Sequence, residues 1–159
     1  MKPHSTLPRI VVLFTLLATA SLRADEAAVA AKLAKIPPAA AAALKKAAGS
    51  ATIKQVDIGK EGKVTIYEVE LTEAGQPDRE ISVLADGTIN TTEETVPLEK
   101  VPEAARKAIE AGAKGAKIER VQKITRKGTN VTYEALYVNK GKKSEVEYFE
   151  DGKLKPEEK

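Results

Sequence analysis

Carboxylate side chains are the groups in this sequence with the best placement for chemistry. Glu68 and Glu70, like Glu145 and Glu147, are two residues apart in strand-like stretches, and residues i and i+2 of a strand share one face. Two carboxyl groups across a cleft can hydrolyse a glycosidic bond, and grouped carboxylates can bind Ca²⁺. The same spacing also arises on a solvated strand face, and the sequence has no Asp-x-Asp-x-Asp loop. We interpret these acids as surface charge and predict no catalytic residue and no metal site.

The side chains that most other reactions need are missing from the chain after residue 24. Its single His (His4) and single Met (Met1) precede that point, and Cys and Trp do not occur at all. Without His or Cys there is no zinc site of the usual ligands, no haem ligand, no Cys nucleophile and no Ser–His triad. We therefore expect a protein that is not an enzyme and that carries no cofactor and no disulfide.

Residues 1–24 are predicted to form a secretory signal peptide. Lys2 and Arg9 accompany an apolar run of 11 residues, Ile10–Ala20, whereas a membrane-spanning helix needs about 20. Small residues allow cleavage after Ala20 or Ala24. The mature protein is expected to be exported, periplasmic or extracellular, without stable membrane insertion after cleavage. An uncleaved anchor is the alternative.

Removal of this segment cancels the basic excess of the chain. The whole sequence has 26 basic and 23 acidic residues, but Lys2, Arg9 and Arg23 are the only charged residues before Asp25. A chain that begins at Asp25 is therefore neutral in formal charge. Because neutralising the phosphates of a nucleic acid needs a lasting excess of Lys and Arg, we expect no nucleic-acid partner.

The remaining sequence resembles itself at a spacing of 65 or 66 residues. The matching pairs are LAKIP (Leu33–Pro37) with LEKVP (Leu98–Pro102), Tyr67-Glu68 with Tyr133-Glu134, and Asp86-Gly87 with Asp151-Gly152. Their order over more than 50 residues indicates duplication. We predict two units, residues 25–90 and 98–159, joined by a linker over residues 91–97, which is polar and has no strand alternation.

Each unit is predicted to contain one helix and three strands. The helices follow Pro37 and Pro102 and reach Gly49 and Gly112. The strands cover residues 52–58, 64–71 and 80–84, and then 117–124, 131–138 and 144–149. The Asp-Gly pairs form a last turn, which can lead into a short edge strand, and residues 25–35 fit a short helix or a frayed start. The fold class is α+β, with two tandem repeats that each pack a helix on an antiparallel sheet of three to four strands.

This order of motifs resembles the PepSY and PepSY-like domains of exported bacterial proteins. The segments IPPAAAAALKKAAGSATIKQV, IYEVEL and EISVLADGTI carry the resemblance in the first unit, and VPEAARKAIEAGAKGAKIERV, TYEALY and SEVEYFEDGKL carry it in the second. The resemblance implies a helix on an antiparallel sheet, a location outside the cytoplasm, and an association with protease propeptides and the restraint of peptidases. It supplies no catalytic residues, and a peptidase partner must be another chain.

Strand alternation predicts which side chains face away from the helices. Tyr67, Val69 and Leu71 should face the helix of the first unit, and Tyr133, Ala135 and Tyr137 that of the second. The opposite face then carries a candidate interaction surface made of Ile66, Glu68, Leu136, Val138 and Phe149. Apolar side chains on a face expected to be solvated are typical of binding surfaces. The alternative is that the two units pack these faces on each other.

The sequence therefore predicts an exported, non-catalytic binding module. It should contact a protein or peptide through the faces or edges of its sheets, and restraint of a peptidase is the most concrete form of this function. The expected partner is another exported or envelope protein. The alternative is a periplasmic protein that binds a small ligand or ion in a cleft between the units.

Overall fold

The computed structural model describes residues 26–128 and 130–156 as helices and strands with short connections. A helix over residues 26–33 comes first. The elements that follow are α2 (Pro38–Ala48), β1 (Thr52–Glu61), β2 (Val64–Thr72), β3 (Arg79–Val83), β4 (Ile89–Thr95), a 3₁₀ turn (Leu98–Lys100), α3 (Glu103–Gly112), β5 (Lys117–Arg126), β6 (Thr132–Asn139) and β7 (Lys142–Phe149). None of the helices in this part of the chain is long and apolar enough to cross a membrane. The predicted signal peptide lies outside the described residues.

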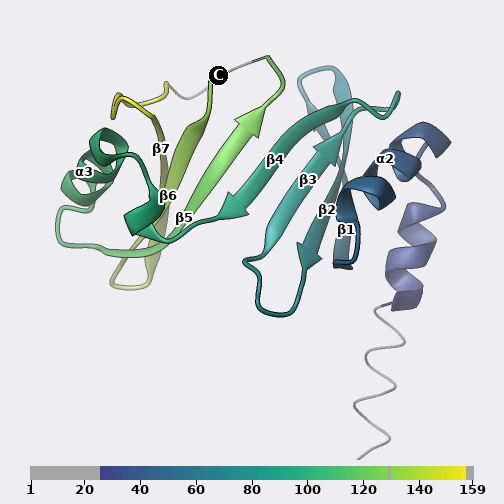
Figure 1. Cartoon of the computed structure of the whole chain (residues 1–159), viewed down its shortest axis with the longest axis horizontal. Coiled ribbons are helices and arrows are strands. Elements are labelled where there is room, and N and C mark those ends of the chain that lie inside the picture. Colours follow the sequence, from purple (N-terminus) through teal and green to yellow (C-terminus); the bar gives the residue numbers. More distant parts are fainter. Residues whose placement is uncertain (1–25, 129, 157–159) are drawn as a thin grey trace, which may run out of the picture.

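One antiparallel sheet of seven strands, in the order β1 to β7, runs through the whole molecule. Figure 1 shows α2 and α3 at opposite ends of this sheet, with β4 between them. The predicted α+β class is confirmed. The two predicted units do not stack face to face, because β4 pairs with β5 and places Thr91 opposite Arg126 and Thr95 opposite Gln122. They are joined edge to edge in one sheet.

The prediction of a linker over residues 91–97 is wrong for residues 91–95. These residues belong to β4, which pairs with β3 on one side and β5 on the other. Threonine is β-branched and favours strands, and Thr91, Thr92 and Thr95 supply that preference. The apolar alternation is missing because β4 contributes no side chain to either of the two apolar cores.

Each helix covers its own apolar core, and both lie on the same face of the sheet. Ala40 and Leu44 of α2 are completely buried, as are Ala105 and Ile109 of α3. Alanine at the contact lets a helix approach the strands closely. The predicted inward residues Tyr67, Val69 and Leu71 pack in the first core, and Tyr133, Ala135 and Tyr137 pack in the second. The predicted strand faces are therefore confirmed.

The two Asp-Gly turns contact the first turn of these helices. Gly87 and Gly152 have φ values of +83° and +82°, which only glycine adopts freely. A Cβ atom on Gly87 would lie 2.8 Å from the carbonyl oxygen of Ala39, and one on Gly152 would lie 2.7 Å from that of Ala104. The turns therefore need glycine both for the backbone angle and for the close approach of the helix.

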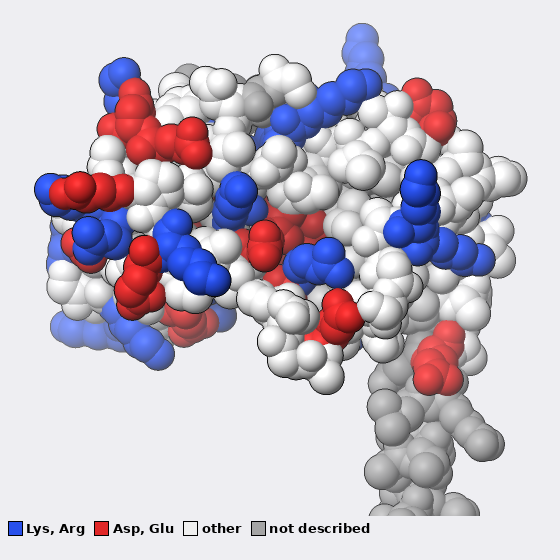
Figure 2. Space-filling view, in the orientation of Figure 1, with Lys and Arg blue, Asp and Glu red and all other residues white. Residues whose placement is uncertain are grey.

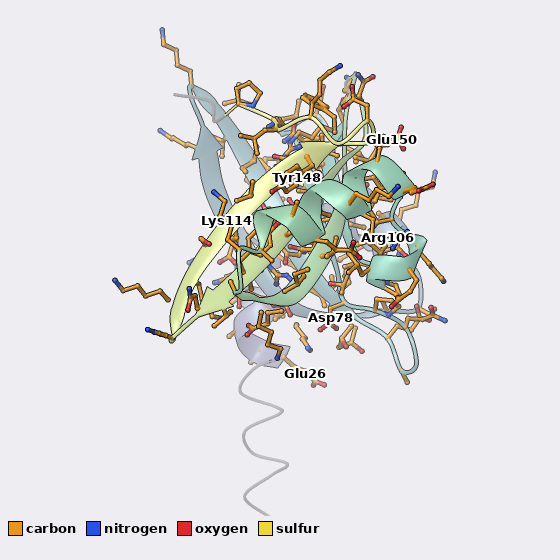
Figure 3. All side chains as sticks on the ribbon, turned by 90° about the vertical axis from the view of Figure 1, so that its left-hand side faces the viewer. Glu26, Asp78, Arg106, Lys114, Tyr148 and Glu150 are labelled. Carbon is orange, nitrogen blue, oxygen red and sulfur yellow. The ribbon has the colours of Figure 1, made fainter. Side chains whose placement is uncertain are left out.

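A pair of tyrosines ties α3 to the sheet. The Tyr137 hydroxyl donates to the Ile109 carbonyl over 2.8 Å and lies 3.2 Å from the Tyr148 hydroxyl. Figure 3 shows Tyr148 beside α3, close to the strands that the helix crosses. Burial, together with the hydrogen bond to Tyr148, raises the pKa of Tyr137. The phenol therefore stays neutral and able to donate at every physiological pH.

Candidate functional site: the open face of the sheet

The face of the sheet opposite α2 and α3, here called the open face, carries a continuous row of side chains across the strands. Strand pairing places Glu70 on β2 directly opposite Glu80 on β3, and Glu80 directly opposite Glu93 on β4. We call these three residues the glutamate ladder. The same row then continues over β5, β6 and β7 with Ile124, Thr132 and Phe149. The ladder thus occupies one half of a row that spans most of the sheet.

The open face curves inward. Its polar side chains Ser82, Thr91, Gln122 and Thr132 are only 2%, 8%, 4% and 1% exposed, although both α2 and α3 pack on the other face. Side chains of neighbouring strands must therefore cover one another on this face. In contrast, Glu94 and Thr125, on the helix-bearing face in the middle of the sheet, are exposed. Curvature toward the open face explains both observations.

All five residues of the predicted interaction surface lie on the open face, in two groups. Ile66 and Glu68 are on β2, whereas Leu136 and Val138 are on β6 and Phe149 is on β7. Leu136 is 7% exposed and is thus almost covered by its neighbours, while the other four are partly exposed. The central strands β3, β4 and β5 separate the two groups. Whether these residues bind a partner stays a prediction.

Sequence reasoning missed the centre of this face, which is acidic. Glu80, Glu93 and Glu134 are partly buried there, and no cation of the described residues lies within ion-pair distance of them. Like charges directly opposite each other on paired strands are destabilising. Alternation could have placed each glutamate on this face, but only the register of the strands shows that Glu80 and Glu93 are opposite each other.

The protonation of these carboxyl groups reflects their surroundings. Burial raises the pKa of Glu93 to about 7, and the negative charges of Glu80, Glu134 and Glu68 act in the same direction, against a smaller effect of Arg126. Burial also raises the pKa of Glu134, with the charges of Glu145 and Glu147 adding to it and those of Arg120 and Arg126 opposing it. A substantial fraction of Glu93 is therefore protonated at neutral pH.

Carboxylates at the margins of the open face have cationic partners instead. Glu147 accepts hydrogen bonds from Arg126 and Thr132, and Lys155 Nζ lies 3.2 Å from its second oxygen. Burial opposes the ionisation of Glu147, but these hydrogen bonds outweigh it and lower the pKa. Glu145 lies 3.7 Å from Arg120, and Glu70 lies 3.8 Å from Lys54. Among the described residues, the carboxylates Glu80, Glu93 and Glu134 at the centre of the open face thus differ from these in having no ion pair.

Besides the open face, neither the charged side chains nor the possible metal ligands of the described residues form a cluster of their own on the visible side of the molecule. Figure 2 shows Lys and Arg interspersed with Asp and Glu on the side of the molecule that it presents. Within the described residues, no three His, Cys, Asp or Glu side chains are arranged to hold a metal ion. The open face, with an acidic centre and apolar flanks, is the candidate site, and its composition suits the binding of another molecule's surface.

Solved structures share this fold. A DUF2874 family protein from Bacteroides ovatus superposes with a TM-score of 0.58 at 15% identity, over 75% of this chain and 84% of that one. A protein from Bacteroides eggerthii, described as periplasmic, gives 0.61 at 15% identity, over 75% and 85% of the two chains. A BLIP-like protein from Bacteroides fragilis gives 0.55 at 21% identity, over 77% and 85%.

These similarities establish the fold and nothing finer. A scan with protein-family models finds no match, and neither does a sequence search of curated proteins. The PepSY resemblance of the sequence therefore stays a prediction. The chain has the fold of these Bacteroides proteins, and the open face is the feature of that fold from which a function can be argued.

Proposed function

We propose that this protein is an exported, non-catalytic binding module that takes up a protein partner on the open face of its sheet. The observation that carries the proposal is the uncovered, inward-curving face of one continuous sheet, with the partly exposed apolar side chains Ile66, Val138 and Phe149 around its centre. Apolar side chains at such positions lose contact with water when a partner's surface covers them, which favours binding.

Two kinds of likeness support this proposal. The solved structures with the same fold include one described as periplasmic and one described as BLIP-like, and the sequence begins with a predicted signal peptide. The PepSY resemblance adds a peptidase as the most concrete partner. In this proposal the protein would cover part of an exported peptidase and restrain it.

We further infer that the two halves of the chain are tandem copies. The contact of Gly87 with Ala39 is repeated by Gly152 with Ala104, and each residue of the second pair lies 65 positions after its counterpart. The Asp-Gly turns also share a hydrogen bond, from Thr88 N to Asp86 Oδ1 and from Lys153 N to Asp151 Oδ1. Duplication would supply an extended face that a single copy is too small to form.

A capture experiment with matched variants tests the proposed binding. The purified mature protein is cross-linked in the exported fraction of its native cells, beside Ile66→Arg and Val138→Arg, which place a charge on the open face. Thr125→Arg adds the same charge at an exposed position of the helix-bearing face and is the control. We expect a partner that wild type and T125R retain and that both open-face variants lose. Equal capture by all four proteins, each checked for folding by circular dichroism, would overturn the proposal.

A further inference from the structure

The centre of the open face carries carboxyl groups that form no ion pair with a described Lys or Arg. Elsewhere on this face Glu147 has Arg126 and Lys155, Glu145 has Arg120, and Glu70 has Lys54. No Lys or Arg of the described residues forms an ion pair with Glu80, Glu93 or Glu134. Arg126 acts on Glu93, and Arg126 and Arg120 act on Glu134, only as weaker, more distant charges. These three partly buried carboxylates therefore lie on the face that neither α2 nor α3 covers.

The geometry of the centre suits one cationic side chain that enters from outside. Side chains directly opposite each other on antiparallel strands have Cβ atoms about 4.5–5.5 Å apart, so Glu80 and Glu93 can contact the same group. A guanidinium has five N–H donors in a planar fork and can bond two carboxylates at once.

We propose that Glu80 and Glu93, supported by the negative charge of Glu134, receive a cationic side chain, an arginine or a lysine, from the protein that binds the open face. This inference rests on the proposed function and specifies the chemistry of the partner's surface. Opposed like charges are a cost to the free protein, and a complementary charge removes that cost on binding. The partner should therefore present a basic residue at the middle of its contact surface, with apolar residues around it.

Binding of such a group should release a proton. The charged groups that face Glu93 are Glu80 on β3, Glu68 on β2, Glu134 on β6 and Arg126 on β5, and three of the four are negative. Glu93 consequently keeps its proton up to near-neutral pH, and a cation placed beside it favours the ionised form. The affinity for a cationic partner should therefore rise as the pH rises from about 5 to about 8.

An arginine peptide tests the cation site without knowledge of the partner. Acetylated hexa-arginine amide is titrated into the protein at low ionic strength, and binding is followed by calorimetry and by amide chemical shifts. Glu93→Gln removes one charge from the open face, and Glu94→Gln removes one from the other face of the same strand. We expect E93Q to bind about tenfold more weakly and E94Q to bind within twofold of wild type. The shifts should centre on β3, β4 and β5.

Two results would overturn the inference. One is an equal loss of affinity in E93Q and E94Q, which would indicate attraction to the overall charge alone. The other is a set of shifts outside the centre of the open face. Calorimetry in two buffers of different ionisation enthalpy adds an independent measurement, because wild type should release a proton near pH 7 and E93Q should not.

The inference and the proposed function fail in different ways. If E93Q captures the partner as well as wild type does while I66R loses it, the face binds protein but its glutamates do not receive a cation. If hexa-arginine binds at Glu93 but no partner depends on the open face, the cation site is supported and the proposed function is wrong.

Discussion

Glu80 on β3 and Glu93 on β4 stand directly opposite each other, in the middle of the sheet and on the face that α2 and α3 leave uncovered. Paired strands hold the two carboxyl groups at neighbouring positions, and partial burial limits the water that can separate their charges. The repulsion falls as one of them takes up a proton. The folded protein is therefore expected to respond to pH at this position.

Replacement of Glu93 by Gln should stabilise the protein at alkaline pH. The pKa of Glu93 in the folded protein is about 7, against an ordinary value of 4.5. A raised pKa contributes stability that is complete below about pH 4.5 and is lost as the pH rises through about 7. Gln resembles the neutral acid, so E93Q should equal wild type near pH 4.5 and exceed it by about 1–3 kcal/mol at pH 8. Urea unfolding at several pH values measures the difference.

Glu94→Gln is the control for this prediction. Glu94 is on the same strand but faces the other side, is exposed, and lies opposite Lys123. Its replacement should change the free energy of unfolding by no more than about 0.5 kcal/mol at any of these pH values. A pH-independent difference between E93Q and wild type would show that the charge of Glu93 does not oppose folding.

Local periodicity was enough to predict the two cores. The faces of a strand alternate within a few residues, so Val69 and Leu71 could be assigned to one face and Glu68 to the other from the sequence alone. A helix that begins after a proline and reaches a glycine is also defined within about a dozen residues. These features depend only on residues that are close together in the sequence, so the sequence alone is enough to predict them.

Relations between distant strands could not be predicted in this way. The ladder from Glu70 to Glu80 to Glu93 exists because two turns set the register of three strands, and a shift of one residue would place its members on opposite faces. A strand between two cores has no apolar face, so the sequence pattern of β4 resembles that of a linker. The close approach of Gly87 to Ala39 could not be predicted, because the positive φ of the turn already explains a glycine at this position. Only the packed helix shows that a Cβ atom would also come too close to the Ala39 carbonyl oxygen.

Replacement of Glu147 by Gln should remove part of the acid sensitivity of the protein. The hydrogen bonds from Arg126 and Thr132 outweigh burial and hold the pKa of Glu147 below its ordinary value. A lowered pKa contributes stability that is present above about pH 4.5 and is lost in more acidic solution. E147Q should be less stable than wild type by about 1–2 kcal/mol at pH 7, with a difference that shrinks toward pH 3.

Glu145→Gln is the matched control on the same strand. Glu145 is exposed, and its contact with Arg120 at 3.7 Å is a surface ion pair, which is worth about 0–1 kcal/mol. Thermal unfolding of the two variants between pH 3 and pH 7 separates the effects. Equal losses in E145Q and E147Q at pH 7 would contradict the role assigned to the partly buried hydrogen bonds of Glu147.

Replacement of Gly152 by Ala should cost more than the same change at Gly141. Both glycines have positive φ, +82° and +79°, so alanine is unfavourable at either, by about 1 kcal/mol. At Gly141 a Cβ would meet none of the described atoms within 4 Å, whereas at Gly152 it would lie 2.7 Å from the Ala104 carbonyl oxygen. We expect losses of about 1 kcal/mol for G141A and about 2–4 kcal/mol for G152A in denaturant unfolding. Similar losses of stability in G141A and G152A would mean that α3 can shift away from the added methyl group without a cost in free energy.

Removal of the Tyr137 hydroxyl should weaken the attachment of α3 to the sheet. This group donates to the Ile109 carbonyl near the end of the helix and also contacts Tyr148. Tyr137→Phe should lower the free energy of unfolding by about 1–2 kcal/mol, since a buried hydrogen bond is lost. Tyr148→Phe removes only the longer contact of 3.2 Å and should cost less. In the double variant the losses should not add, because both single changes remove the same contact between the two hydroxyls. Strict additivity in urea unfolding would show that the hydroxyls do not interact.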